Sequence, residues 1–322
     1  MKLFLRRRLI YVGVAIGALT LTGAGIGTAQ ASTSHVVQSH NSRPASVKPT
    51  VVLVHGAWAD GSSWDKVAAK LQHDGYRVVT PPNLLSGVKN DADNLRAYLD
   101  TITGPVVLVG HSYGGMVITN AAVGNKQVKA LVYVDAYIPD EHDTVLSLTS
   151  AVPGSVFAAE ASTVFDQVAI PGADPGIVNL YVKPSIFGKA FADKTIPAKD
   201  VAVLAARQRP LALNALVEES GEPAWRTIPS WSVIGKQDAV IPAAEQVAMS
   251  KRANAHTVEI NAPHLSMVTD TGAVTNQIEA AATATNSPPP GRGPPPPPPH
   301  GWPLHGVAAW AVRPTRPLLL PI

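Results

Sequence analysis

Six short runs of apolar and β-branched residues recur along this chain, separated by segments with a helical pattern. The runs cover residues 50–54, 77–80, 105–109, 129–134, 231–234 and 257–260. Such runs are typical of strands buried on both faces of a sheet. Between them, Trp64, Val67 and Leu71 recur at helical spacing, and Gly75 ends that pattern. Strand and helix alternate, which predicts an α/β fold with a mostly parallel sheet flanked by helices.

The alternation stops at about residue 137 and resumes at about residue 228. No clear strand pattern occurs in this stretch, and helices are predicted at residues 155–168, 201–207 and 211–219. An insertion of this size between two core strands indicates a helical cap over the carboxyl edge of the sheet, where ligands bind in open α/β sheets. We therefore expect one domain over residues 49–285, with its cap over about 137–228.

The beginning of the chain has the composition of a targeting segment. Residues 1–31 combine a basic start, a long apolar run and a small-residue cleavage site, which predicts a secretory signal peptide. An uncleaved membrane anchor is the alternative, and the glycines in the run and the cleavage site argue against it. We expect a secreted, extracellular protein that begins near Ser32 and has no stable membrane insertion. The Arg-Arg pair leaves the Sec and Tat export routes both open.

Two further segments differ from the domain in composition. Residues 32–48 are expected to be a flexible lead-in. Residues 286–322 are rich in proline, which breaks helices and strands, so we expect a disordered tail.

Composition also excludes several classes of chemistry. The chain has no cysteine, which rules out a thiol nucleophile and a thiolate metal site. The net charge of +3 owes much to three arginines at residues 6–8 in the targeting segment, so no nucleic-acid partner is expected. No His-Glu-x-x-His or P-loop motif occurs, and we expect no metal and no cofactor. The oligomeric state is not decided by the sequence.

The most informative motif is Gly-His-Ser-Tyr-Gly at residues 110–114, which fits the pattern G-x-S-x-G. It follows a predicted strand and precedes a helix-compatible segment, and in that context the pattern marks a nucleophilic serine. Glycines at both flanks permit a sharp turn that projects Ser112 above the sheet at a helix N-terminus. A serine hydroxyl is a poor nucleophile at neutral pH, so it needs a base and a group that orients the base.

Asp238 and His264 complete the expected order of serine, acid and histidine. Each follows a predicted strand at its carboxyl end. His256 lies at the opposite end of its strand, which leaves His264 as the expected base. Asp135 is the rival acid because it directly follows the strand at residues 129–134, and we favour Asp238 over it.

Cleavage of an ester also needs donors for the developing oxyanion. The loop after the first strand carries Val-His-Gly-Ala-Trp, and its Ala57 backbone N–H is expected to oppose that of Tyr113, the residue after the nucleophile. Trp58 and Tyr137 are expected to line the substrate pocket.

These motifs resemble the α/β-hydrolase superfamily, in particular the EstC-like small carboxylesterases, and are similar to those of hydroxynitrile lyases and plant methylesterases. The resemblance spans about residues 49–285 and is carried by residues 55–58, 61–64, 110–115, 135–140, 237–242 and 263–264. It implies a cofactor-free serine hydrolase with a small helical cap that cleaves a small carboxylic ester. Hydroxynitrile lyases of this branch have a lysine just after the triad acid, whereas Ala239 and Val240 follow Asp238 here. That departure disfavours cyanohydrin cleavage.

The sequence therefore predicts an esterase in which Ser112 forms an acyl-enzyme with a small-molecule ester. The sequence leaves two alternatives open. The same fold could serve a non-catalytic ligand-binding protein, or a lyase could use the same triad.

Overall fold

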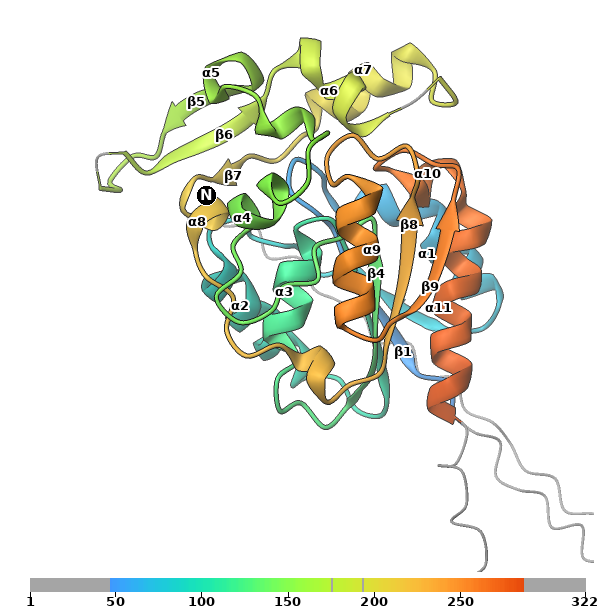
Figure 1. Ribbon diagram of the computed structural model, residues 1–322. Helices are drawn as coiled ribbons and strands as arrows, with labels where there is room; N and C mark the ends of the chain where they lie inside the picture. The colour runs from blue at the N-terminus through green and yellow to red at the C-terminus, as the bar shows by residue number, and fades with distance from the viewer. Residues whose placement is uncertain (1–46, 175, 193, 287–322) are drawn as a thin grey trace, which may run out of the picture. The chain divides into compact units, whose positions relative to one another are not determined.

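The computed structural model describes residues 47–174, 176–192 and 194–286 (Figure 1). The predicted signal peptide, the lead-in up to residue 46 and the proline-rich tail from residue 287 lie outside the described residues. Within the described ranges, no helix has both the length and the apolar character needed to cross a membrane.

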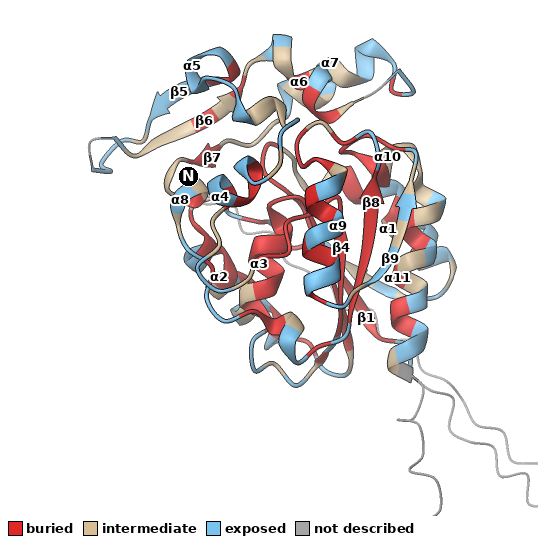
Figure 2. Cartoon of the chain, viewed as in Figure 1, coloured by how far each residue is buried: buried red, intermediate tan, exposed pale blue. Residues whose placement is uncertain are grey.

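A six-stranded parallel sheet forms the centre of the described domain, in the order β2-β1-β3-β4-β8-β9. Its strands are β1 (Thr50–Val54), β2 (Arg77–Val79), β3 (Val106–His111), β4 (Val128–Val134), β8 (Ser230–Gly235) and β9 (His256–Ile260). Each predicted run is a strand, with ends that differ by about two residues at most. The central strands β1, β3 and β4 are buried except at Lys129 in β4, which explains why their sequences are mostly apolar (Figure 2). The predicted α/β fold is confirmed.

Helices cover both faces of this sheet (Figure 1). They are η1 (Gly61–Trp64), α1 (Asp65–His73), α2 (Val88–Leu99), α3 (Gly114–Ala121), α9 (Ala243–Arg252), α10 (Ser266–Thr269) and α11 (Thr271–Asn286). α1 packs against α11, and α2 packs against α3. In α11 the buried residues Val274, Ile278 and Ala281 recur at helical spacing, so one side of that helix faces the sheet.

The cap between β4 and β8 contains strands as well as helices. Its elements are α4 (Val145–Ser150), η2 (Val156–Ala158), α5 (Ala161–Val164), β5 (Phe165–Ala169), β6 (Val178–Val182), α6 (Pro184–Phe191), α7 (Ala198–Ala206), β7 (Leu211–Ala212), α8 (Asn214–Val217) and η3 (Ala224–Arg226). β5, β6 and β7 form a separate antiparallel sheet.

The expectation of a purely helical cap is therefore wrong. The helix predicted at residues 155–168 is interrupted and ends in β5, and the one predicted at residues 211–219 begins with β7, whereas residues 201–207 largely fall in α7. β5 is exposed apart from Phe165, so it carries no hydrophobic alternation of its own. Pairing with β6 stabilises it, and that partner cannot be recognised from the local pattern.

Hydrogen bonds between distant segments hold the cap over the carboxyl ends of the core strands. The backbone N–H of Ala212 donates to the carbonyl of Leu85 at 2.9 Å. The Trp58 indole Nε1 donates to the carbonyl of Leu180 in β6 at 2.8 Å. These contacts place cap residues above the turn that carries Ser112.

We expect Gly115→Ala to lower the free energy of unfolding by about 3 kcal/mol or more, the upper range for overpacking. A Cβ at Gly115 would lie 2.0 Å from the backbone carbonyl oxygen of Tyr137, which cannot move without shifting the start of the cap. Urea unfolding measures the change. Gly61→Ala is the control, since its Cβ would meet Thr80 at an ordinary 3.6 Å. Equal stability of the two variants would contradict this packing.

Candidate active site

Ser112 lies in the turn between β3 and α3, with a φ of 53° in the left-handed region. Two glycines make the turn possible. A Cβ at Gly110 would lie 2.6 Å from the carbonyl of Gly114, and one at Gly114 would lie 2.7 Å from the carbonyl of Val54. The Ser112 carbonyl accepts from the backbone N–H of Gly115 at 2.9 Å. A tight turn thus holds the serine at the carboxyl end of the sheet.

His264 and Asp238 form a buried hydrogen-bonded pair. His264 follows β9, Asp238 follows β8, and Nδ1 of the histidine lies 2.8 Å from Oδ2 of the aspartate. Neither side chain is exposed to solvent. The other ring nitrogen of His264, Nε2, is buried and has no hydrogen-bond partner in the described part of the chain. An acceptor at that position is what a general base requires.

The partners of Asp238 decide where the shared proton lies. The Val240 and Ile241 backbone N–H groups donate to Oδ1 at 2.7 and 2.9 Å, and Nε2 of Gln246 donates to Oδ2 at 2.8 Å. Burial raises the pKa of Asp238 above its usual value, although these three donors oppose that shift. A protonated carboxyl would need an acceptor, whereas these neighbours donate. We therefore assign the proton to Nδ1 of His264, with Asp238 ionised.

Burial also governs the imidazole. Desolvation lowers the pKa of His264 below its usual 6.5, which favours the neutral ring at physiological pH. With Nδ1 protonated toward Asp238, the lone pair lies on Nε2.

No hydrogen bond joins Ser112 to His264, since Nε2 is unpartnered among the described residues. The two are linked through His111, which precedes the serine. Nε2 of His111 donates to the His264 carbonyl at 2.9 Å, and the two ring centroids are 4.8 Å apart. Burial and the neighbouring His264 lower the pKa of His111 well below its usual value. The neutral His111 thus fixes the base loop beside the serine turn.

Asp135, the rival acid, lies at the end of β4 with a φ of 43°. Its Oδ1 accepts from the Gly235 N–H at 2.8 Å and its Oδ2 from the Ser266 N–H at 3.1 Å. Burial and the nearby Asp238 raise the pKa of Asp135 well above its usual value. Its two oxygens bind the loops that carry Asp238 and His264, and no hydrogen bond to the His264 ring is formed within the described ranges.

The predicted oxyanion donors lie in the same cavity as Ser112. Neither the Ala57 nor the Tyr113 backbone N–H donates to a protein acceptor within the described ranges. Gly56 brings the Ala57 loop against the serine, because a Cβ on Gly56 would lie only 2.7 Å from the Ser112 Cβ. His55 supports this loop by accepting from the Asn83 N–H at 3.1 Å. Both amides are therefore free to bind an anion.

The space between the atoms that line this cavity is about 440 Å³, part of it open to solvent. Trp58 and Tyr137, the two residues predicted to line it, both do so, and the Tyr137 hydroxyl bonds to Thr149 Oγ1 at 2.7 Å. Apolar cap residues complete the lining, namely Val145, Leu146, Phe157, Phe165, Leu211 and Leu216. Sequence reasoning missed this cap lining and also missed Gln246, whose only signal is its place one helical turn after the acid loop.

Within the described residues, no group of three or more histidine, aspartate or glutamate side chains could hold a metal ion.

Comparisons with known proteins agree with this architecture. Residues 51–277 match the model of the alpha/beta hydrolase family, and the chain belongs to that family. A carbendazim hydrolyzing esterase from Nocardioides sp. (strain SG-4G) is 38% identical over 122 residues, which are 33% of this chain and 50% of that protein. The match thus spans only half the length of that esterase.

Two further relatives cover more of the domain. Methylesterase 1 of Arabidopsis thaliana is 26% identical over 222 residues, 62% of this chain and 82% of that protein. The structure of a pyrethroid hydrolase from Sphingobium faniae JZ-2 superposes with a TM-score of 0.58 at 20% identity, covering 73% of this chain and 98% of that one. The structural likeness is evidence of the shared fold.

We expect Asp135→Ala to destabilise the protein by about 3 kcal/mol, because two buried N–H groups lose their acceptor at about 1–3 kcal/mol each. Urea unfolding measures the change. Asp93→Ala is the control, since it removes only surface ion pairs with Lys89 and Arg96 and should leave stability nearly unchanged. An Asp135→Ala protein as stable as wild type would show that this carboxyl does not hold the two loops.

Proposed function

We propose that this chain is a secreted serine carboxylesterase that cleaves small carboxylic esters through an acyl-enzyme on Ser112. The observation that carries the proposal is the buried Asp238–His264 pair with an unpartnered Nε2, next to a serine on a glycine-flanked turn. Secretion rests on the sequence of residues 1–31 alone.

In the proposed reaction, Nε2 of His264 takes the proton of the Ser112 hydroxyl as Oγ attacks the ester carbonyl. The tetrahedral intermediate collapses when the imidazolium returns the proton to the leaving alkoxide, which departs as an alcohol. Water then attacks the acyl-enzyme and gives a proton to the same imidazole. When the second tetrahedral intermediate collapses, the imidazolium returns that proton to Ser112 Oγ and the carboxylic acid is released.

Two features of the site lower the barriers of these steps. Asp238 is ionised in our assignment and lies 2.8 Å from Nδ1, so its charge stabilises the imidazolium that forms in a buried site. The Ala57 and Tyr113 amides, free of protein acceptors in the described part of the chain, would bind the oxyanion. Removing one such donor typically costs about 10²- to 10³-fold in kcat.

The substrate class follows from the lining of the cavity. Its residues are mainly apolar and aromatic, and no Lys, Arg, Asp or Glu side chain lines it among the described residues. That lining favours an uncharged ester with apolar substituents. The names of the relatives, which describe a carbendazim hydrolyzing esterase and methylesterases, support ester cleavage.

We expect Ser112→Ala to lower kcat for p-nitrophenyl butyrate by at least about 10⁴-fold, as removal of a triad nucleophile does. Wild type should show a burst of p-nitrophenol and be labelled at Ser112 by a fluorophosphonate, as peptide mass spectrometry reads out. Ser185→Ala, on the exposed face of α6, is the matched control and should keep full activity. Tight ligand binding without labelling would instead favour a binding protein, and conversion of a carbonyl adduct with esters untouched would favour a lyase.

The pH profile tests the state of His264. Activity needs the neutral imidazole, and because burial lowers its pKa, activity should persist as the pH falls below 6.5. The acid limb of kcat/KM is expected to have its midpoint well below pH 6.5, measured over the range in which circular dichroism shows folded protein. His142→Gln removes an exposed histidine whose pKa is raised by Glu219 and should leave the limb unchanged. A midpoint at pH 6.5 or above would contradict a desolvated base.

A further inference from the structure

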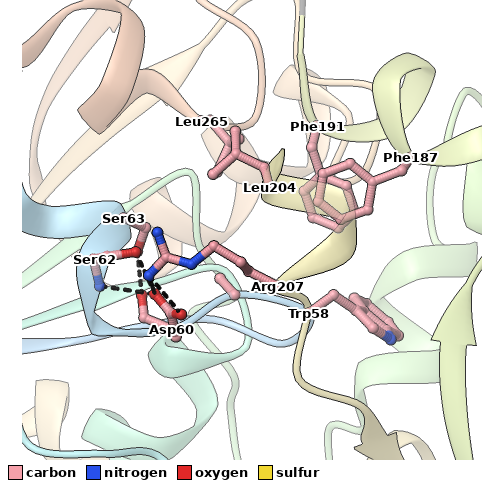
Figure 3. A pocket seen from close by; sticks show the side chains of 10 residues that line it. Trp58, Asp60, Ser62, Ser63, Phe187, Phe191, Leu204, Arg207 and Leu265 are labelled. Carbon is pink, nitrogen blue, oxygen red and sulfur yellow. Dashed lines mark hydrogen bonds and ion pairs between the residues drawn. The ribbon is translucent and has the colours of Figure 1, made fainter. Parts of the chain in front are cut away.

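A second cavity lies next to the one that holds Ser112. The space between its lining atoms is about 350 Å³, part of it open to solvent. It is lined by apolar cap residues and by the polar residues of a core loop (Figure 3). Its lining includes Phe187, Phe191, Leu204 and Leu265. Trp58 is the residue that lines both cavities. Its side chain is therefore a wall between them.

Contacts from the cap fix this wall in place. The Trp58 backbone has a φ of 56°, and the residue is only 5% exposed. Nε1 donates to the Leu180 carbonyl at 2.8 Å, so the polar end of the indole is held by β6. Its ring stacks on Phe165 at 5.4 Å and meets Phe157 edge to face at 5.0 Å between centroids. A side chain held in this way does not swing aside at little cost.

The second cavity also lies beside the proposed base. Leu265, which follows His264, lines it, and the Phe191 ring is 5.5 Å from the His264 ring between centroids. At its polar side, Arg207 of the cap bonds to Oδ2 of Asp60 at 3.1 Å (Figure 3). The apolar side of this cavity could hold an alkyl chain that extends from the reacting ester, if the Trp58 ring were absent.

We propose that Trp58 sets substrate size by closing the second cavity to the ester. This inference rests on the proposed function. It names the substrate class as esters whose acyl chain is short enough to fit the Ser112 cavity alone. Removal of the indole would join the two cavities into one apolar channel that accepts longer acyl chains.

The test is a panel of p-nitrophenyl esters from acetate to decanoate with wild type, Trp58→Ala and Trp58→Phe. We expect the ratio of kcat/KM for decanoate to that for butyrate to rise at least about tenfold in Trp58→Ala, because burial of about two more methylene groups suffices for such a change. The ratio cancels any general loss of turnover from disturbing neighbouring Ala57. Trp58→Phe keeps a smaller aromatic ring in the wall, so its ratio should lie between those of wild type and Trp58→Ala. It also provides the test if Trp58→Ala does not fold.

Two controls distinguish the effect of removing the Trp58 ring from a general loosening of the protein. Phe187→Ala enlarges the second cavity without touching the first, so alone it should not change the ratio, whereas combined with Trp58→Ala it should raise the ratio further. Trp225→Ala removes a half-buried tryptophan that lines neither cavity and should leave the ratio unchanged. An unchanged ratio in active Trp58→Ala, or an equal rise in Trp225→Ala, would overturn the inference.

A binding measurement keeps the inference independent of catalysis. Methyl ketones of increasing chain length are uncleavable analogues of the esters, and calorimetry gives their Kd for Ser112→Ala and for the Ser112→Ala, Trp58→Ala double variant. The double variant should gain affinity for 2-dodecanone and not for 2-hexanone. If wild type hydrolysed none of the esters, the proposed function would fail. Ketone affinities that do not change when Trp58 is replaced would separately contradict the proposed role of Trp58.

Discussion

The site depends on one buried hydrogen bond, between Nδ1 of His264 and Oδ2 of Asp238. Both side chains are fully buried, so bulk water does not compete with this contact. Desolvation keeps the imidazole neutral, and the donors around Asp238 keep the shared proton on the ring. The result is a free lone pair on Nε2. The proposed base is thus prepared by burial and orientation before any substrate binds.

Several tight backbone contacts bring the loops of the site together. Gly110, Gly114 and Gly56 each lie where a Cβ would collide with a neighbouring segment of the site. Asp135 then binds the loops after β8 and after β9 through its two oxygens. These contacts lie at the carboxyl ends of adjacent parallel strands, which is where α/β sheets form their binding sites. The parallel sheet therefore positions the site, and the cap shapes the space above it.

Much of this arrangement could be predicted from sequence because its signals are local. The six core strands are mostly apolar runs, and the glycines on either side of Ser112 identify the turn that carries it. The choice between Asp238 and Asp135 is harder, because both follow core strands. Only coordinates show that Asp238 contacts His264, whereas Asp135 binds two backbone amides. The β5-β6-β7 sheet was not predictable, because β5 is stabilised by a partner strand and not by its own pattern.

The protonation state of His264 can be measured directly by long-range ¹H–¹⁵N correlation NMR on histidine-labelled protein. Comparison with a His264→Gln sample assigns the signals. We expect Nδ1 to carry the proton and Nε2 to be unprotonated at pH 7, and we expect this pattern to persist as the pH falls below 6.5. A ring protonated on both nitrogens at pH 7, or one protonated on Nε2 alone, would contradict it.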